Sequence, residues 1–83
     1  MNEVKLQVAA SVEQTQRAIA GIGGVTDQLD EALTRLRLTA AGTAHPSLVD
    51  AISRLEQAKS RLDDAATLAR AAADAADAYR GLA

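Results

Sequence analysis

Few side chains in this chain have the chemistry that catalysis or metal binding requires. His45 is the only histidine, and there is no cysteine. A zinc site needs several His or Cys ligands, and a nucleophile needs a base, a group that orients the base and an oxyanion hole. A single histidine beside Pro46 supplies neither set, so we expect His45 to be an exposed residue of a connection. The sequence predicts a protein that is not an enzyme and that binds no metal.

The densest carboxylates are spaced for surface pairs. Asp63 adjoins Asp64, and Asp74 lies close to Asp77. Carboxylate pairs perform acid–base catalysis only in a cleft that shifts their pKa values, whereas these residues fall on the polar face of a helical pattern. Oppositely charged residues four apart on a helix form solvated surface pairs. The pairs with this spacing are Glu13–Arg17, Glu31–Arg35, Asp50–Arg54 and Arg70–Asp74.

The segment 21–24, Gly-Ile-Gly-Gly, does not have the pattern of a phosphate-binding loop. No predicted strand precedes it, and no Lys-Ser or Lys-Thr follows it. The sequence therefore predicts no cofactor. Three glycines cost a helix about 3 kcal/mol relative to alanine. The apolar register nevertheless continues through them, so we favour one continuous helix that can bend at 21–24. The alternative is a break there, with Thr26 or Asp27 capping a separate helix.

The composition predicts an all-α fold and argues against a nucleic-acid partner. The apolar residues are mainly Ala, Leu, Val and Ile, Tyr79 is the only aromatic residue, and Pro46 is the only proline. Alanine in bulk favours helices, whereas strands favour β-branched and aromatic residues. Nine Lys and Arg against eleven Asp and Glu give a net charge of −2. Such a chain has no basic face for phosphates and too few aromatic residues to stack on bases.

Membrane insertion is also not expected. No uninterrupted run of about eighteen apolar residues is present, so we expect no transmembrane helix. Balanced charge on the polar faces and the scarcity of interfacial aromatic residues argue against binding to a membrane surface. The first residues lack the basic and apolar regions of a secretory signal. We therefore expect a cytoplasmic protein, with export without a leader as the alternative.

Two apolar stripes predict an antiparallel hairpin of two long helices. The helices are expected over residues 3–41 and 47–82, joined by a turn at 42–46 in one domain over 1–83. Gly42 is expected to end the first helix in the left-handed conformation, and Ser47 to begin the second as its N-cap, with Asp50 completing a capping box. Steps of three and four residues define the stripes. The first runs through Val8, Val12, Thr15, Ile19, Ile22, Thr26, Leu29, Leu33, Leu36 and Ala40, and the second through Leu48, Ala51, Leu55, Ala58, Leu62, Ala65, Ala69, Ala72, Ala76, Tyr79 and Ala83.

Further apolar columns flank both stripes. The first helix adds Val4, Ser11, Ala18, Val25, Ala32 and Thr39, and the second adds Leu68, Ala71, Ala75, Ala78 and Leu82. A helix that is apolar around most of its circumference needs more than one contact surface. We therefore expect two hairpins to associate by an isologous two-fold into a homodimeric four-helix bundle. The expected interface residues are Val12, Ile19, Ile22, Leu29, Leu33, Leu36, Leu55, Leu62, Leu68, Ala69, Ala76 and Tyr79.

These features predict a non-catalytic module for oligomerisation and protein–protein interaction. One alternative is an obligate partner or chaperone of a larger helical protein. A binder of lipid surfaces is the least favoured alternative.

The layout of two long amphipathic helices around a short central turn resembles the WXG100 or ESAT-6-like proteins. The resemblance implies a bacterial chain of the kind that pairs as an antiparallel four-helix dimer and leaves the cell through type VII secretion. In this chain the turn has Gly42 without the tryptophan of that family's Trp-x-Gly motif. Ala83 follows Tyr79 by four residues, where the family has an acidic residue. The abundance of Ala, Arg and Asp is similar to that of proteins from GC-rich actinobacterial genomes.

Overall fold

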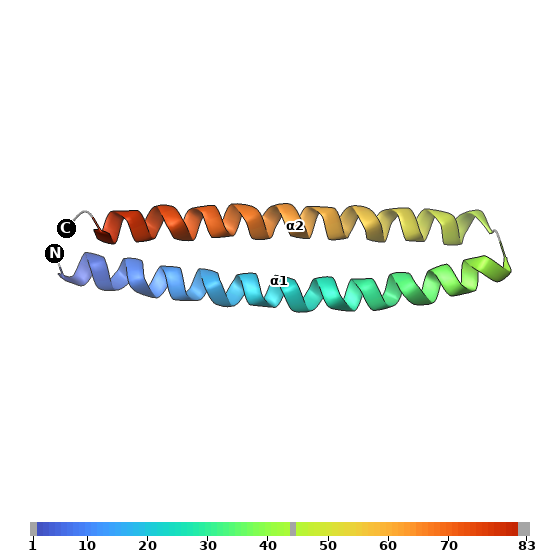
Figure 1. Ribbon diagram of the computed structural model, residues 1–83, viewed down its shortest axis with the longest axis horizontal. Coiled ribbons are helices and arrows are strands. Elements are labelled where there is room, and N and C mark those ends of the chain that lie inside the picture. The colour runs from blue at the N-terminus through green and yellow to red at the C-terminus, as the bar shows by residue number, and fades with distance from the viewer. Residues whose placement is uncertain (1, 44, 82–83) are drawn as a thin grey trace.

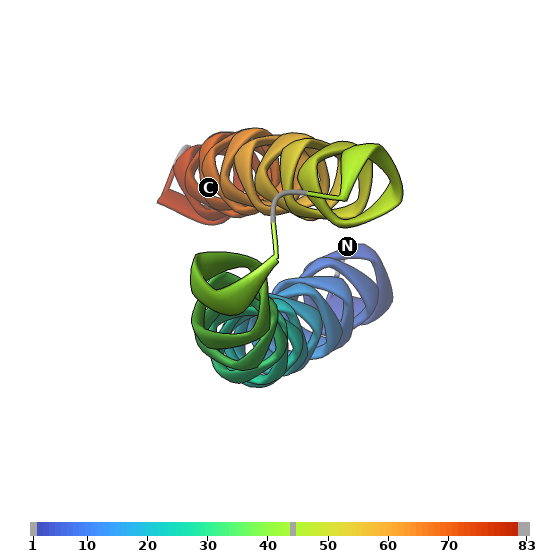
Figure 2. The same ribbon diagram turned by 90° about the vertical axis from the view of Figure 1, so that its right-hand side faces the viewer.

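The computed structural model describes residues 2–43 and 45–81, which form two helices, α1 (Asn2–Gly42) and α2 (Pro46–Gly81). The helices run antiparallel, with the connection at one end and the start of α1 beside the end of α2 at the other (Figure 1). Viewed end on, the described part of the chain is one helix packed on one helix (Figure 2). The predicted all-α antiparallel hairpin is confirmed. Residue 82, the expected last residue of the second helix, lies outside the described residues.

The hairpin is a thin rod. Its Cα atoms extend over 62 × 15 × 13 Å, and the radius of gyration is 18.7 Å. A compact chain of the same length has a radius of gyration of about 12 Å. Because the rod is only two helices thick, a side chain is buried within it only between α1 and α2.

Helix α1 continues without a break through residues 21–24. The packing face supplies the reason, since Ile19, Ile22 and Thr26 are all half-buried against α2 on both sides of the glycines. The Thr26 hydroxyl also donates a hydrogen bond of 2.9 Å to the carbonyl oxygen of Ile22, within the same stretch. The continuous apolar contact therefore outweighs the low helix propensity of glycine, which is a weak preference that packing often overrides.

The end of α1 differs from the expectation for Gly42. Gly42 is the last residue of α1, and no described glycine has a positive φ. The backbone N–H of Thr43 instead donates a 3.2 Å hydrogen bond to the carbonyl oxygen of Ala40. This i to i−3 bond tightens the last turn and satisfies a terminal carbonyl without a left-handed residue.

The beginning of α2 also differs from the expectation, because His45 is its N-cap in place of Ser47. The Nδ1 atom of His45 accepts a hydrogen bond of 3.1 Å from the N–H of Ser47. The carbonyl oxygen of His45 accepts bonds from the N–H groups of Leu48 and Val49, at 3.0 and 3.3 Å. Pro46 occupies the first helical position, where its fixed φ suits the helix and its missing N–H leaves no donor unsatisfied. The proline therefore starts the helix before Ser47 is reached.

The core is one side chain thick. Among the described residues, only Leu33 is fully buried, and the rest of the core consists of Val12, Ala66 and Ala73. Along α1, the remaining residues of the predicted stripe are half-buried against α2. The large side chains of α1 near the open end lie opposite alanines of α2, so a large residue meets a small one across the contact.

The contact face of α2 rotates along its length. From Leu48 to Leu62 it follows the predicted stripe, but beyond Leu62 the alanines at 66 and 73 are buried, while those at 65 and 72 are exposed. Arg80 is half-buried and Tyr79 is exposed. An α-helix has 3.6 residues per turn, so a strict seven-residue repeat drifts by about 20° per heptad. The face that meets α1 has therefore moved by one residue toward the end of α2.

Candidate functional site

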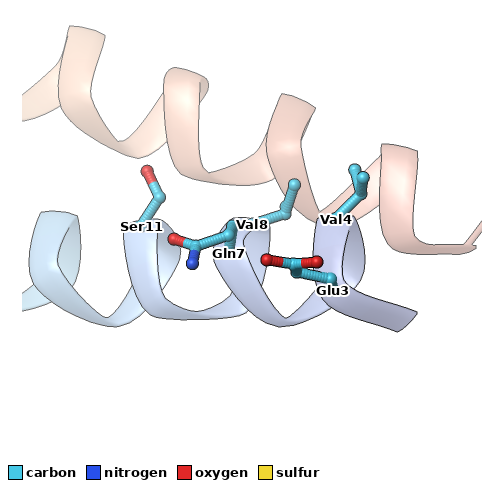
Figure 3. Close-up of a pocket in the computed structure, with 5 residues that line it drawn as sticks. All are labelled: Glu3, Val4, Gln7, Val8 and Ser11. Atoms are coloured by element: carbon cyan, nitrogen blue, oxygen red, sulfur yellow. The ribbon is translucent and has the colours of Figure 1, made fainter. Parts of the chain in front are cut away.

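The described surface has shallow hollows. One follows the beginning of α1 and is lined by Glu3, Val4, Gln7, Val8 and Ser11, all from that helix. Figure 3 shows Val4, Val8 and Ser11 pointing toward α2, while the side chains of Glu3 and Gln7 stay beside the α1 ribbon and do not point toward α2. A depression with one carboxylate and one amide brings together no nucleophile with a base. Its chemistry suits contact with another surface.

The described residues form neither a metal site nor a membrane span. No group of three or more His, Cys, Asp or Glu side chains there is arranged to hold a metal ion. Neither helix, over its described length, contains a stretch that is apolar enough to cross a membrane. The single histidine uses its Nδ1 atom as a helix cap, which gives His45 a structural role in the connection.

One long side of the hairpin is held by charges, and we call it the charged side. An Arg37 guanidinium nitrogen lies 3.2 Å from a carboxylate oxygen of Glu56, and Lys59 pairs with Asp30. Both pairs connect α1 to α2. A hollow at the open end of the same side is lined by residues of both helices, including Asp77 and Arg80, which also pair with each other. The charged side consists of Asp30, Arg37, Glu56, Lys59, Asp77 and Arg80.

The opposite long side carries the flanking apolar columns, and we call it the apolar side. The residues at 9, 16, 23, 30 and 37 flank the α1 contact on the charged side, so the column that begins at Val4 flanks it on the other. Val4 and Val25 keep 48% and 46% of their surface exposed. On α2, Leu68 is 71% and Tyr79 50% exposed. The apolar side consists of Val4, Ser11, Ala18, Val25 and Ala32 of α1 and Ala58, Ala65, Leu68, Ala72, Ala75 and Tyr79 of α2. Toward the turn, the exposed Arg54 and Arg61 lie in the same column of α2 as Leu68 and Ala75, and they line a shallow hollow with Gln57 and Ala58.

The expected interface residues divide between the two surfaces. The contact between α1 and α2 brings together Val12, Ile19, Ile22, Leu29, Leu33, Leu36, Leu55, Leu62, Ala69 and Ala76, all buried or half-buried. Leu68 and Tyr79 do not join it, and both lie on the apolar side. For Tyr79 this corrects the expected place on the second stripe, because the rotation of α2 brings Arg80 to that position. The sequence pattern missed Ala66, Ala73 and Arg80, which only the drift of a straight helix against its heptads would have signalled.

The hairpin exposes more surface than a compact protein of its mass. Its accessible surface is 6087 Å² for a chain of 8.6 kDa. A compact monomer of that mass exposes about 4,700 Å², so the excess is about 1,400 Å². Scattered exposed apolar residues are normal, but apolar residues gathered along one side and bordered by charged ones mark an interaction surface. The apolar side is therefore the candidate functional surface.

Comparisons of the chain with protein-family models, with curated proteins and with solved structures give no match.

Proposed function

We propose that the chain is a non-catalytic helix–helix interaction module, and that two copies associate into a four-helix bundle. The single observation that supports this most is the apolar side, where Leu68 is 71% exposed beside the exposed Ala65, Ala72 and Ala75. A helix that is apolar around most of its circumference needs a contact on more than one face. In the lone hairpin, α2 covers the predicted stripe of α1 and leaves most of the flanking column open.

The thin core supports the same proposal. Burying one Leu or Val side chain that is otherwise exposed contributes about 1.5–3 kcal/mol. Within residues 2–43 and 45–81 of the lone hairpin, Leu33 is the one such side chain that is fully buried. Covering Val4, Val25 and Leu68 in a second contact would add burial of the same kind, so association would stabilise the fold and the complex together.

Light scattering on a size-exclusion column, with circular dichroism on the same fractions, tests the proposal. We expect a helical species at twice the chain mass of 8.6 kDa at micromolar concentration. Dilution should lower both the mass and the thermal midpoint, because association and stability are linked. A fully helical monomer whose midpoint does not depend on concentration would refute self-association.

The alternative occupant of the apolar side is a different helical protein, and the small core of the lone hairpin favours this as the second candidate. In that case the chain alone should be a weakly helical monomer that gains helicity when the partner is added. The resemblance to WXG100 proteins makes an exported helical protein one such partner. Lipid-surface binding is the third reading, and it requires a gain in helicity with anionic vesicles.

A further inference from the structure

The apolar side has a mid-point, and Leu68 lies near it. Helix α2 begins at Pro46, so Leu68 lies about 33 Å along it at 1.5 Å per residue. Half of the 62 Å length of the rod is about 31 Å. On α1, Gly21 follows Ala18 by three residues and precedes Val25 by four, so it lies next to their column on the apolar side. It is about 31 Å from the last residue of α1, Gly42, and so also close to the mid-point. A leucine and a glycine therefore occupy the centre of one long side.

The two ends of the apolar side complement each other. Tyr79 lies about 50 Å from the beginning of α2, near the open end. Near the turn, Arg54 and Ala58 lie about 12 and 18 Å from the beginning of α2. A two-fold axis that crosses the rod between about 31 and 33 Å from the beginning of α2 relates each position to one on the second copy. It brings Tyr79 of one copy, at about 50 Å, opposite the part of the second copy's α2 that lies about 12 to 16 Å from its beginning. The bulky aromatic residue of one copy would then meet the small Ala58 of the other, with the Arg54 guanidinium near its ring.

Charge favours one of the two possible orientations. Arg35 and Arg54 border the apolar side, both near the turn and both exposed, and Arg54 also donates a 2.8 Å hydrogen bond to the carboxylate of Asp50 in its own helix. If two copies lay parallel about an axis along the rod, α1 of one would face α2 of the other, and Arg35 would lie beside Arg54 of the second copy. Like charges placed together in an interface are unfavourable. The antiparallel arrangement separates these arginines by most of the rod's length.

We propose that a second copy of the chain docks on the apolar side, antiparallel, about a two-fold axis that crosses the rod at its mid-point. In this arrangement Leu68 packs against Leu68 of the second copy, and α1 approaches its counterpart where Gly21 has no side chain. Tyr79 covers Ala58 and Arg54 of the second copy. The proposal rests on the self-association proposed above and adds the face, the orientation and the residues on the axis.

The area available matches what a specific interface needs. A side 62 Å long and 13 to 15 Å wide offers about 800–900 Å² from each copy, and specific interfaces bury about 1,200–2,000 Å² in total. A Cβ atom added at Gly21 meets nothing within 4 Å in its own hairpin. The space beside Gly21 is thus open for the second copy.

Cysteine cross-linking tests the face and the orientation, because the chain has no native cysteine. Treated with a short bifunctional maleimide, Leu68→Cys should form a covalent dimer in high yield. Ala71→Cys, on the outer surface of α2, is the control and should remain mainly monomeric in denaturing electrophoresis. Tyr79→Cys alone should not self-link, but an equimolar mixture of Tyr79→Cys and Ala58→Cys should give the mixed dimer. Self-linking of Tyr79→Cys, or equal yields for Leu68→Cys and Ala71→Cys, would overturn the proposed arrangement.

A pair of matched leucine variants separates this proposal from self-association in general. Leu68 and Leu38 are 71% and 73% exposed, but Leu38 lies on the outer surface of α1 in the column that contains Arg17 and Glu31. Leu68→Asp should raise the dimer dissociation constant more than tenfold, since the change occurs twice at the axis. Leu38→Asp should leave the dissociation constant within about twofold of the unmodified chain. A dimer that tolerates Leu68→Asp would refute the face and leave self-association standing, whereas a monomeric unmodified chain would refute both.

Discussion

Replacing Gly23 and Gly24 together by alanine should stabilise the hairpin. Both residues lie inside α1, and no described glycine has a positive φ that an L-amino acid would resist. A Cβ atom added at either position meets no neighbouring atom within 4 Å. Neither residue belongs to the apolar side, so the proposed docking of a second copy gives no reason for a loss. The helix propensity of alanine therefore acts without opposition.

The magnitude follows from the helix interior. Each glycine replaced by alanine stabilises a helix by about 0.5–1 kcal/mol, so the double variant should gain about 1–2 kcal/mol in free energy of unfolding. For a domain of this size, 1 kcal/mol corresponds to about 4–8 °C in Tm. The expected rise in Tm is roughly 5–15 °C. Gly21→Ala should have the same effect on the isolated helix but should weaken the dimer, because Gly21 lies near the proposed axis.

Thermal unfolding followed by far-ultraviolet circular dichroism is the assay. It should be run at several protein concentrations, because the Tm of a self-associating chain depends on concentration. Ala20→Gly, at an exposed position of the same helix, is the reverse control and should lower Tm by a similar amount per residue. An unchanged or lower Tm for the double variant would contradict this expectation and would show that α1 uses these glycines for a bend or a contact.

Three further changes test the core, the cap and the ion pairs. Leu33→Ala should lower the free energy of unfolding in urea by about 2–5 kcal/mol, because Leu33 is fully buried. Leu38→Ala, at an exposed position, should change it by less than about 0.5 kcal/mol. Equal effects would contradict the assigned core. His45→Asp should raise the free energy of unfolding by about 0.5–1 kcal/mol, and Tm with it, because a carboxylate is a better N-cap for α2 and interacts favourably with the helix dipole. A lower Tm would argue against His45 as the cap. Asp30→Asn, which removes the pair with Lys59, should cost less than about 1 kcal/mol, and a loss that persists in molar salt would indicate a packing role.

The register of α1 could be predicted from the sequence because its stripe is pinned by large residues. Val12, Ile19 and Leu33 have polar or small neighbours on the opposite face, so only one orientation buries them all. The flanking column that begins at Val4 was visible in the same way. The side of the hairpin on which this column lies, relative to the ion pairs, could not be predicted, because it depends on which residues of α2 lie opposite α1. The pairs Arg37–Glu56 and Asp30–Lys59 fix it, and they join residues 19 and 29 positions apart.

The second half of α2 could not be resolved from its pattern. Positions 65 and 66 are both alanine, and so are 72 and 73, so hydrophobicity is equal for the two candidate columns. The choice then depends on helical twist, which brings Ala66 and Ala73 to α1 and carries Arg80 with them. Tyr79 was expected on the contact because it continues the three- and four-residue steps of the second stripe. Arg80 tolerates the position because its guanidinium reaches Asp77.

The first residue of α2 could not be predicted from the sequence for a different reason. Ser47 and Asp50 match a capping box, but Pro46 is equally suited to the first helical position. The two signals place the helix start at different residues. A proline preset in helical φ needs no partner for its nitrogen, whereas a serine cap requires a turn to form first. The hydrogen bond from Ser47 to His45 shows which signal prevails.

The unequal distribution of large residues along the rod has a consequence for how the chain folds. Leucines from both helices meet near the connection, whereas the open end joins the valines of α1 to the alanines of α2. Pairing next to the turn closes the shortest loop and so loses the least chain entropy. We expect the hairpin to zip from the turn outward, and to do so quickly because its earliest contacts are local. Amide hydrogen exchange should then be slowest around Leu33 and Leu55 and should quicken steadily toward the open end, where local opening requires the least free energy.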